Sequence, residues 1–148
     1  IILPHLAKRT KSVAQNLSQW LATELPVSRP IHGDFYDKQA IVNAGKVNLI
    51  DLDAACLGSP LVDLGSYVAH LERQVGNHSI SASDVETQRD TLISAYERLT
   101  GSVRTDQLNR YTALGLFALI HQPFRDWSPD WPAQTELLLN RVETLLGS

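Results

Sequence analysis

The chain has 148 residues, of which 43% are hydrophobic and 20% are charged, with eight Gly, seven Pro and one Cys. This composition is that of a folded domain with its own core, and it excludes collagen-like, disordered and disulfide-stapled proteins. The formal net charge of -3 argues against a nucleic-acid-binding module, which is typically basic, and no apolar run reaches the ~18 residues needed to cross a bilayer.

The chain contains no Met and begins Ile1-Ile2-Leu3-Pro4. Because a natural reading frame starts with Met, we expect either a processed chain or a piece of a longer protein. The length suits one domain over residues 1–148. No signal peptide opens the chain and a single Cys excludes an internal disulfide, so we expect a cytoplasmic setting. Cys56 itself is expected to be a small buried hydrophobe, with a nucleophilic role as the alternative.

The first half of the chain predicts one helix and one β-hairpin. Apolar residues recur at helical spacing over Lys11–Leu25, and the prolines that follow, beginning with Pro26, end that helix. Ala40–Asn43 and Val47–Asp51 are typical of two short strands, joined by a turn at Ala44-Gly45. An isolated hairpin is marginal in water, so we expect this one to pack on the helices. The apolar positions of the first helix are Val13, Leu17, Trp20, Leu21 and Leu25.

From Leu61 onward the apolar spacing is helical again. It predicts helices over Leu61–Gln74, Ser83–Leu99 and Thr105–Gln122, and a last helix that Pro132 opens. We therefore expect a mainly α (α+β) fold, in which helices are interrupted by a single small hairpin.

Local signals mark the ends and the inner faces of these helices. Ser83-x-x-Glu86 is a capping-box pattern, and Thr105 is a candidate N-cap. The run Leu114–Ile120 is apolar all round, which indicates a helix in the centre of the core. The other residues expected to face inward are Val85, Leu92, Ile93, Tyr96, Leu99, Leu137, Leu138, Val142 and Leu145.

Polar side chains are grouped around the predicted hairpin. Pairing outward from the Ala44-Gly45 turn puts Gln39 next to Asp51 at the open end of the sheet. Asp34 lies on the loop that enters the same end, so three oxygen-bearing side chains are expected to converge, with Asp53 as a candidate fourth. Hard oxygen ligands suit Mg²⁺ bound together with substrate phosphates, and the His and Cys spacing that zinc needs is missing. A separate carboxylate near such a site is what phosphoryl transfer uses to position an attacking hydroxyl.

Three motifs occur in order around the hairpin: His32-Gly33-Asp34-Phe35-Tyr36-Asp37-Lys38-Gln39, Ile50-Asp51-Leu52-Asp53 and Gly58-Ser59-Pro60-Leu61-Val62-Asp63-Leu64. They resemble the C-terminal lobe of the aminoglycoside phosphotransferase and choline kinase family, relatives of the protein kinases. The family pattern is H-G-D-x-x-x-x-N, then I-D-x-[DE], then G-x-P-x-x-D-L. The resemblance implies a protein-kinase-like fold, with Mg²⁺ as cofactor, ATP as phosphate donor and a small-molecule hydroxyl as acceptor.

The resemblance assigns roles to the residues at matching positions. It implies that Asp34 is the catalytic base that orients the acceptor hydroxyl, and that Asp51 is the principal metal ligand. Gln39 stands where the family has a metal-binding Asn, so it is a candidate metal ligand whose side chain is one methylene longer. Asp53 is a candidate second ligand, with a plain surface role as the alternative.

Three further positions match residues that shape the loop. The resemblance implies that Asp63, at the start of a helix, braces the catalytic loop, and an N-cap role is compatible with that. His32 and Gly33 are also expected to shape this loop, with a general-base role for His32 as the alternative.

The helices after Leu61 are expected to form the acceptor pocket. His121, near the end of the predicted helix Thr105–Gln122, is a candidate to face this pocket, and a histidine favoured by the dipole at a helix C-terminus is the alternative. Trp127 lies beside Asp126 and Asp130 in the link to the last helix. Ring faces beside carboxylates bind cationic or sugar-like molecules, so these three are also candidate acceptor-binding residues, with structural packing of the link as the alternative.

The motifs of a nucleotide-gripping lobe are missing from the sequence, which has no G-x-G-x-x-G and no Lys-bearing V-A-I-K-like strand. We therefore expect the N-terminal lobe to be absent, the chain alone to be inactive, and its apolar cleft surface to favour a homodimer in sedimentation. One alternative is a non-catalytic pseudokinase or binding module. Another is a metal-dependent hydrolase or nucleotidyltransferase built on Asp51-Leu52-Asp53, which leaves His32-Gly33-Asp34 unexplained. No nucleic-acid or membrane partner is expected.

Overall fold

Helices form most of the chain in the computed structural model, which describes residues 3–24, 28–76 and 80–147. In chain order, with η for a short 3-10 turn, the elements are η1 (Pro4–Leu6), α1 (Ala7–Leu21), β1 (Arg29–Ile31), η2 (Asp37–Gln39), β2 (Ala40–Asn43), β3 (Lys46–Leu49), η3 (Leu52–Ala54), β4 (Cys56–Gly58), α2 (Pro60–Gly76), α3 (Ala82–Thr100), α4 (Thr105–Leu119), α5 (Gln122–Arg125) and α6 (Trp131–Leu146). The strands pair as two small antiparallel sheets, so the expected mainly helical fold with a small β component is confirmed. Within these ranges no helix is both long and apolar enough to cross a membrane.

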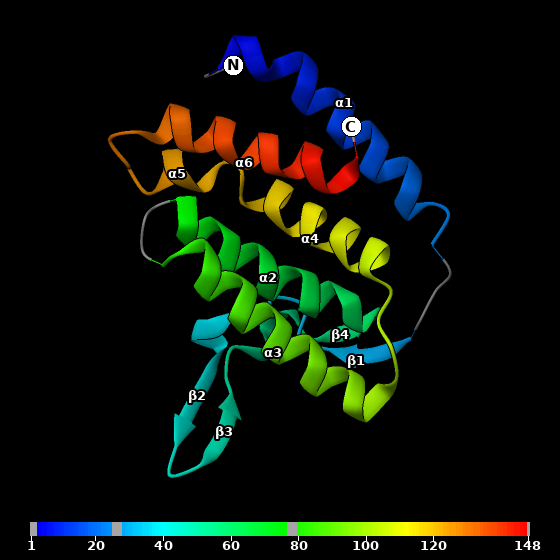
Figure 1. Cartoon of the computed structure of the whole chain (residues 1–148). Coiled ribbons are helices and arrows are strands. Elements are labelled where there is room, and N and C mark those ends of the chain that lie inside the picture. The colour runs from blue at the N-terminus through cyan, green and yellow to red at the C-terminus, as the bar shows by residue number, and fades with distance from the viewer. Residues whose placement is uncertain (1–2, 25–27, 77–79, 148) are drawn as a thin grey trace.

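The centre of the fold is the contact between α2 and α4, which lie side by side (Figure 1). Two glycines bring these helices close together: Gly65 faces the backbone of Tyr111, and Gly115 faces Ala69. A Cβ at Gly65 would lie 2.5 Å from the carbonyl carbon of Tyr111, a distance at which two carbon atoms overlap. Because α6 packs on α4 and α3 packs on α2, the layers run from α1 through α6, α4 and α2 to α3 (Figure 1).

Buried apolar side chains fill the space between these layers. Leu116 of α4 and Leu139 of α6 have no exposed surface, which confirms the expected central position of the helix that contains Leu114–Ile120. Trp20 of α1 meets Tyr111 edge to face, with ring centroids 4.9 Å apart. The other buried members of this core are Leu6, Val13, Leu17, Ala69, Ala113, Leu138 and Val142.

Helix α1 begins and ends earlier than the sequence pattern predicts. It starts at Ala7 and ends at Leu21, while residues 25–27 lie outside the described residues. Leu21 is exposed, contrary to expectation, because it lies about 100° round the helix from the buried Trp20. The residues that face the core as expected are Val13, Leu17 and Trp20.

The capping box of α3 lies two residues before the predicted one. Ser81 Oγ accepts a hydrogen bond from Asp84 N at 3.1 Å, and the Asp84 carboxylate accepts one from Ser81 N at 3.2 Å. The expected box of Ser83 and Glu86 is therefore wrong. The spacing of a small hydroxyl residue and an acid occurs twice here, and only the first pair flanks the start of the helix at Ala82.

The predicted inner faces of α3 and α6 are each wrong at one leucine. Leu99 is 87% exposed, because α3 packs mainly on α2 and this side chain lies off that contact. Leu137 is 52% exposed, because it lines a cavity beside α6 and is not covered by another helix. The residues that are buried or half-buried as expected are Val85, Leu92, Ile93, Tyr96, Leu138, Val142 and Leu145.

Helix α4 ends earlier than predicted. It stops at Leu119, and Pro123 lies in the first turn of the separate short helix α5. Proline is tolerated there because a backbone N–H in the first turn has no partner within the helix. Arg104 and not Thr105 holds the N-cap position of α4, without a side-chain cap. Pro132 lies in the first turn of α6, one residue after its start.

Strands β2 and β3 form the predicted hairpin. Its turn is Ala44-Gly45, and its register pairs Asn43 with Lys46 and Val42 with Val47, as expected. The expectation that the hairpin packs on the helices is wrong, because it projects away from them (Figure 1). The apolar side chains that it leaves exposed are Ile41, Val42, Val47 and Leu49.

A second sheet, in which β1 pairs with β4, is absent from the prediction. Arg29 lies opposite Gly58, and Ile31 lies opposite Cys56. Strand β1 has three residues and includes Pro30, so its sequence carries no recognisable strand period. Cys56 is exposed, because this small sheet leaves it uncovered, and the expected burial of the thiol is wrong.

The layer contact around Leu116 predicts a large effect of truncation. Leu116→Ala removes a fully buried side chain between α4 and its neighbours, and we expect it to lower the free energy of unfolding by about 3 kcal/mol. Leu99→Ala is the matched control, since this exposed leucine should cost less than about 0.5 kcal/mol. Urea unfolding followed by circular dichroism measures both, and equal losses would contradict the assignment of the core.

Candidate functional site

The loop after β1 is bound to the start of α2. Asp63, in the first turn of α2, accepts hydrogen bonds from two successive backbone N–H groups: His32 N at 2.7 Å from Oδ2, and Gly33 N at 2.9 Å from Oδ1. Hydrogen bonds to an ionised acceptor are roughly twice as strong as neutral ones. The N-terminal end of a helix also favours a carboxylate. Residues 32–36, here called the Asp34 loop, are therefore anchored immediately before Asp34.

The backbone of this loop requires a glycine. Gly33 has φ +84°, a region that residues with side chains rarely adopt. A Cβ at this position would also overlap the carbonyl oxygen of Ala54. Both the turn and the close approach of residue 54 depend on the absence of a side chain.

Helix α2 holds the rest of the loop through ring contacts. Tyr67 stacks on Phe35 with ring centroids 5.7 Å apart, and His70 stacks on Tyr36 with centroids 4.3 Å apart. Asp63, Tyr67 and His70 follow the spacing i, i+4 and i+7, so they form one line along the helix. Burial raises the pKa of Tyr67, so its hydroxyl stays protonated at neutral pH.

Asp34 lies between the anchored residues with its side chain exposed. Within the described part of the chain, its carboxylate makes no hydrogen bond or ion pair and is accessible to a bound molecule. Burial lowers the pKa of the nearby His70; Arg73 and Lys38 lower it further, while Asp34 and Asp37 oppose this. The imidazole beside the loop is therefore neutral at pH 7.

A buried histidine joins the Asp34 loop to the hairpin. His32 is 6% exposed, and its Nε2 donates to the carbonyl oxygen of Ile50 at 2.8 Å, because a carbonyl only accepts. The N–H of Ile50 donates in turn to the carbonyl oxygen of Gln39 at 3.0 Å. Among the described residues, Nδ1 of His32 is buried without a hydrogen-bond partner. Through its Nε2, His32 therefore has a structural role, because it links the Asp34 loop to Ile50.

Gln39 and Asp51 meet at the open end of the hairpin, as the register predicts. Gln39 is 4% exposed, and its Nε2 donates to Oδ2 of Asp51 at 3.1 Å. Asp51 has φ +60°, a left-handed backbone that Asp tolerates better than most residues. Ile50, Asp51 and Leu52 are exposed, so the carboxylate of Asp51 reaches solvent.

The described residues contain no preassembled group of three His, Cys, Asp or Glu side chains that could hold a metal. Asp53 is exposed in η3, and Asp34 lies on a separate loop, so the contact seen is that of Gln39 with Asp51. A single exposed carboxylate fits Mg²⁺, which takes its remaining ligands from substrate phosphates and water.

The four candidate acceptor residues lie around α5, and no described contact joins them to the Asp34 loop. Asp126 forms an ion pair with Arg73 of α2. Trp127 is 87% exposed and has φ +55°. His121 and Asp130 are exposed at the N-cap positions of α5 and α6. Among the four, Asp126 alone has a described ion pair with α2, the helix that anchors the Asp34 loop.

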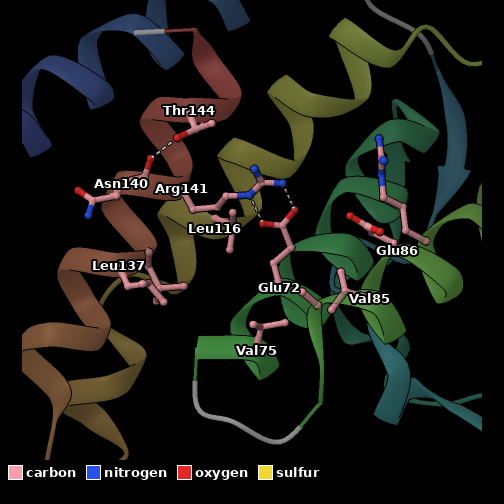
Figure 2. A pocket seen from close by; sticks show the side chains of 12 residues that line it. Glu72, Val75, Val85, Glu86, Leu116, Leu137, Asn140, Arg141 and Thr144 are labelled. Carbon is pink, nitrogen blue, oxygen red and sulfur yellow. Dashed lines mark hydrogen bonds and ion pairs between the residues drawn. The ribbon is translucent and has the colours of Figure 1, made fainter.

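A cavity of about 500 Å³ opens between α6, α2 and α3 (Figure 2). Its lining combines apolar side chains, among them Leu116 and Leu137, with the ion pair of Arg141 and Glu72, in which Nη2 lies 2.8 Å from Oε1. No residue of the Asp34 loop lines it. The helices after Leu61 therefore enclose a cavity, but not at the place where Asp34 is exposed.

Two solved structures share this arrangement of helices and hairpin. One is a thermostable mutant of aminoglycoside phosphotransferase APH(4)-Ia in its apo form, with a TM-score of 0.63 and 18% identity. The other is a thermostable mutant of the same enzyme in a ternary complex with AMP-PNP and hygromycin B, with a TM-score of 0.65 and 16% identity. Each match covers 97% of this chain and 45% or 44% of the other, so the chain spans less than half of these structures. The chain therefore shares the fold of part of these aminoglycoside phosphotransferase structures.

The family of the chain follows from its sequence. The profile of the Phosphotransferase enzyme family matches residues 3–108, which includes the Asp34 loop, the hairpin and α2. The chain therefore belongs to the phosphotransferase enzyme family. A comparison with curated proteins finds no match.

Sequence reasoning missed Tyr67 and His70 as parts of this site. The signal was present, because both residues follow Asp63 at helical spacing within Leu61–Gln74, the helix that the apolar pattern predicts. An isolated His or Tyr on a helix predicts no role in a site until the loop residue that it contacts is known.

The two hydrogen bonds of Asp63 predict a measurable loss when the carboxylate is removed. Asp63→Ala should lower the free energy of unfolding by about 3 kcal/mol and speed hydrogen exchange at the amides of His32 and Gly33, and Asp63→Asn should cost roughly half as much. Asp90→Ala, which removes an exposed carboxylate on α3, is the control and should change stability by less than about 0.5 kcal/mol. Unchanged amide exchange in Asp63→Ala would show that the loop is held by other contacts.

Proposed function

We propose that this chain is the catalytic-loop lobe of an ATP- and Mg²⁺-dependent kinase that phosphorylates a hydroxyl group of a small molecule. The observation that carries the proposal is the Asp34 loop, in which the carboxylate of Asp63 anchors two backbone N–H groups and leaves the Asp34 side chain exposed. An exposed carboxylate on an anchored backbone is suited to align a hydroxyl and to accept its proton. Membership of the phosphotransferase enzyme family supports the same reaction class.

In this proposal Asp34 is the catalytic base. It holds the acceptor hydroxyl and takes its proton as the hydroxyl oxygen attacks the γ-phosphorus of ATP. The bond between the γ-phosphorus and the bridging oxygen breaks, and ADP leaves as the second product. His32 and Gly33 shape the loop, and Asp63 braces it, so that the carboxylate is already oriented when the acceptor arrives. The AMP-PNP bound in one matched structure supports ATP as the donor.

Asp51 is the proposed ligand of Mg²⁺, with Asp53 as a candidate second ligand. Bound there, the metal would neutralise charge on the nucleotide phosphates. Gln39 directs its amide N–H to Oδ2 of Asp51 and so orients that carboxylate; direct coordination through the amide oxygen of Gln39 is the competing prediction.

The rest of the nucleotide cleft is proposed to lie in a second, N-terminal lobe outside these 148 residues. The support is the exposed apolar surface of the hairpin and β4, which is unusual unless another part of the protein covers it, and the coverage of less than half of the matched structures. The isolated chain is then inactive, and its homodimer through the same surface stays a prediction. The exposed apolar residues of the hairpin and β4 are Ile41, Val42, Val47, Leu49 and Leu57.

The acceptor is proposed to be a polar, hydroxyl-bearing small molecule. One matched structure contains hygromycin B, which supports an acceptor of that size and polarity. His121, Trp127, Asp126 and Asp130 remain the candidate acceptor-binding residues, and Asp126 has the strongest support because its ion pair with Arg73 ties it to α2.

A non-catalytic pseudokinase is the second candidate function. The observation in its favour is the amide nitrogen of Gln39 on Asp51, since a donor group faces the carboxylate where the family pattern has a metal-binding Asn. Metal-dependent nucleotide binding without turnover in the protein that contains both lobes would identify this case.

The first test is removal of the proposed base. In the protein that contains both lobes, Asp34→Asn should lower kcat by a factor on the order of 10³ while leaving the unfolding midpoint unchanged, because the side chain is exposed and unpaired within the described residues. Asp106→Asn, which removes an exposed carboxylate at the start of α4, is the control and should retain full activity. Near-normal turnover by Asp34→Asn would refute the assignment of the base.

The second test separates a ligand from an orienting residue. Asp51→Asn should abolish the increase in nucleotide affinity that Mg²⁺ produces, measured by calorimetry with and without the metal. If Gln39 only orients Asp51, Gln39→Leu should weaken Mg²⁺-dependent binding by roughly 10- to 100-fold and not abolish it. Equal and complete losses in the two variants would make Gln39 a direct ligand.

A further inference from the structure

The face-to-face pair of Tyr36 and His70 is the last contact between α2 and the Asp34 loop. The ring centroids are 4.3 Å apart and the ring planes are inclined by 14°. This pair lies two residues after Asp34 along the loop, on the side opposite to the anchor at Gly33. The backbone of Asp34 is thus fixed from before by Asp63 and from after by the ring stack.

Few other contacts hold this part of the loop. Within the described residues, the side chain of Asp34 has no hydrogen-bond partner, and Phe35 is held by ring packing on Tyr67. Two backbone hydrogen bonds follow directly: Gln39 N donates to the carbonyl oxygen of Tyr36 at 3.0 Å, and Ala40 N donates to that of Asp37, and both close the turn of η2. The direction of the Asp34 carboxylate therefore depends on where Tyr36 is held.

Charged groups act on His70 from the Asp34 loop, from η2 and from α2 itself. Asp34 from the loop and Asp37 from η2 favour a protonated imidazole, whereas Lys38 from η2 and Arg73 from α2 itself oppose it. Arg73 is in turn paired with Asp126 at the end of α5. Burial decides the balance and lowers the pKa of His70, so the ring that stacks on Tyr36 at neutral pH is uncharged.

We propose that His70 is a positioning residue for Asp34: it holds Tyr36 by ring stacking and thereby fixes the carboxylate that receives the acceptor hydroxyl. This inference deepens the proposed function and rests on it. On acidification the imidazole takes up a proton, and the cation then attracts the Asp34 carboxylate in competition with the acceptor. A neutral ring is thus part of the working arrangement, and the same contact makes the site sensitive to mild acid.

The electrostatic effect of Asp34 on His70 is tested on this chain without any assay of activity. The pKa of His70, followed by the NMR signals of its imidazole from pH 4.5 to 8.5, should lie below 6.5 and should fall further in Asp34→Asn, by at least about 0.3 unit, because a negative neighbour is lost. Asp53→Asn, which removes an exposed carboxylate that does not act on His70, is the matched control and should leave the titration unchanged. Identical titrations of Asp34→Asn and the unaltered chain would overturn the proposal, as would equal shifts in both variants.

The positioning role is tested on the protein that contains both lobes. His70→Ala removes the stack and should lower kcat by about 10- to 100-fold with little change in the KM for ATP. His70→Phe restores a ring of similar size and should recover most of this loss, and its kcat should no longer decline through the pH range in which His70 titrates. Wild-type kcat in His70→Ala, or an unchanged pH profile in His70→Phe, would contradict the role.

The two experiments separate failure of this inference from failure of the proposed function. If the unaltered two-lobed protein transfers no phosphate, the proposed function fails, and the electrostatic effect of Asp34 on His70 is then decided by the titration of this chain. If transfer depends on Asp34 but His70→Ala is fully active and folded by circular dichroism, the proposed function stands and the positioning role is lost.

Discussion

The carboxylate of Asp63 is the interaction on which the rest of the site depends. It accepts hydrogen bonds from the N–H groups of His32 and Gly33, so a helix and a loop that are 30 residues apart in sequence become one rigid unit. The arrangement satisfies two backbone donors that the tight turn at Gly33 leaves without a strand partner. It also keeps the acid at the N-terminal end of α2, where the helix dipole favours a negative charge.

From this anchor, hydrogen bonds run in sequence to the hairpin. His32 donates to the carbonyl of Ile50, Ile50 donates to Gln39, and Gln39 donates to Asp51. These hydrogen bonds hold the loop that contains Asp34 and the strand end that contains Asp51 in place relative to each other. Because unmade hydrogen bonds are costly in the interior, a shift of either part would leave several of these groups without partners.

The hairpin shows which structural features follow from the local sequence and which do not. Its turn at Ala44-Gly45 and the pairing of Gln39 beside Asp51 follow from sequence alone, because residues on a hairpin find their partners within a few positions. Its exposure does not follow, since the amount of apolar surface that is covered depends on which helices reach it. The same reasoning accounts for Leu99 and Leu137, which fit a buried helical stripe and yet are exposed where no neighbouring helix covers them.

The sequence by itself determined the helical class, the order of the long helices and the hairpin, the register of the hairpin and the motifs that contain Asp34, Asp51 and Asp63, because each of these is a property of neighbouring residues. The tertiary structure alone decided which face of α2 meets the loop, and it thereby brought Tyr67 and His70 to the site. It also formed the sheet of β1 and β4 and placed Gly65 against α4. The physical reason is that these contacts join residues far apart in sequence, and they form only when two packed surfaces fit together.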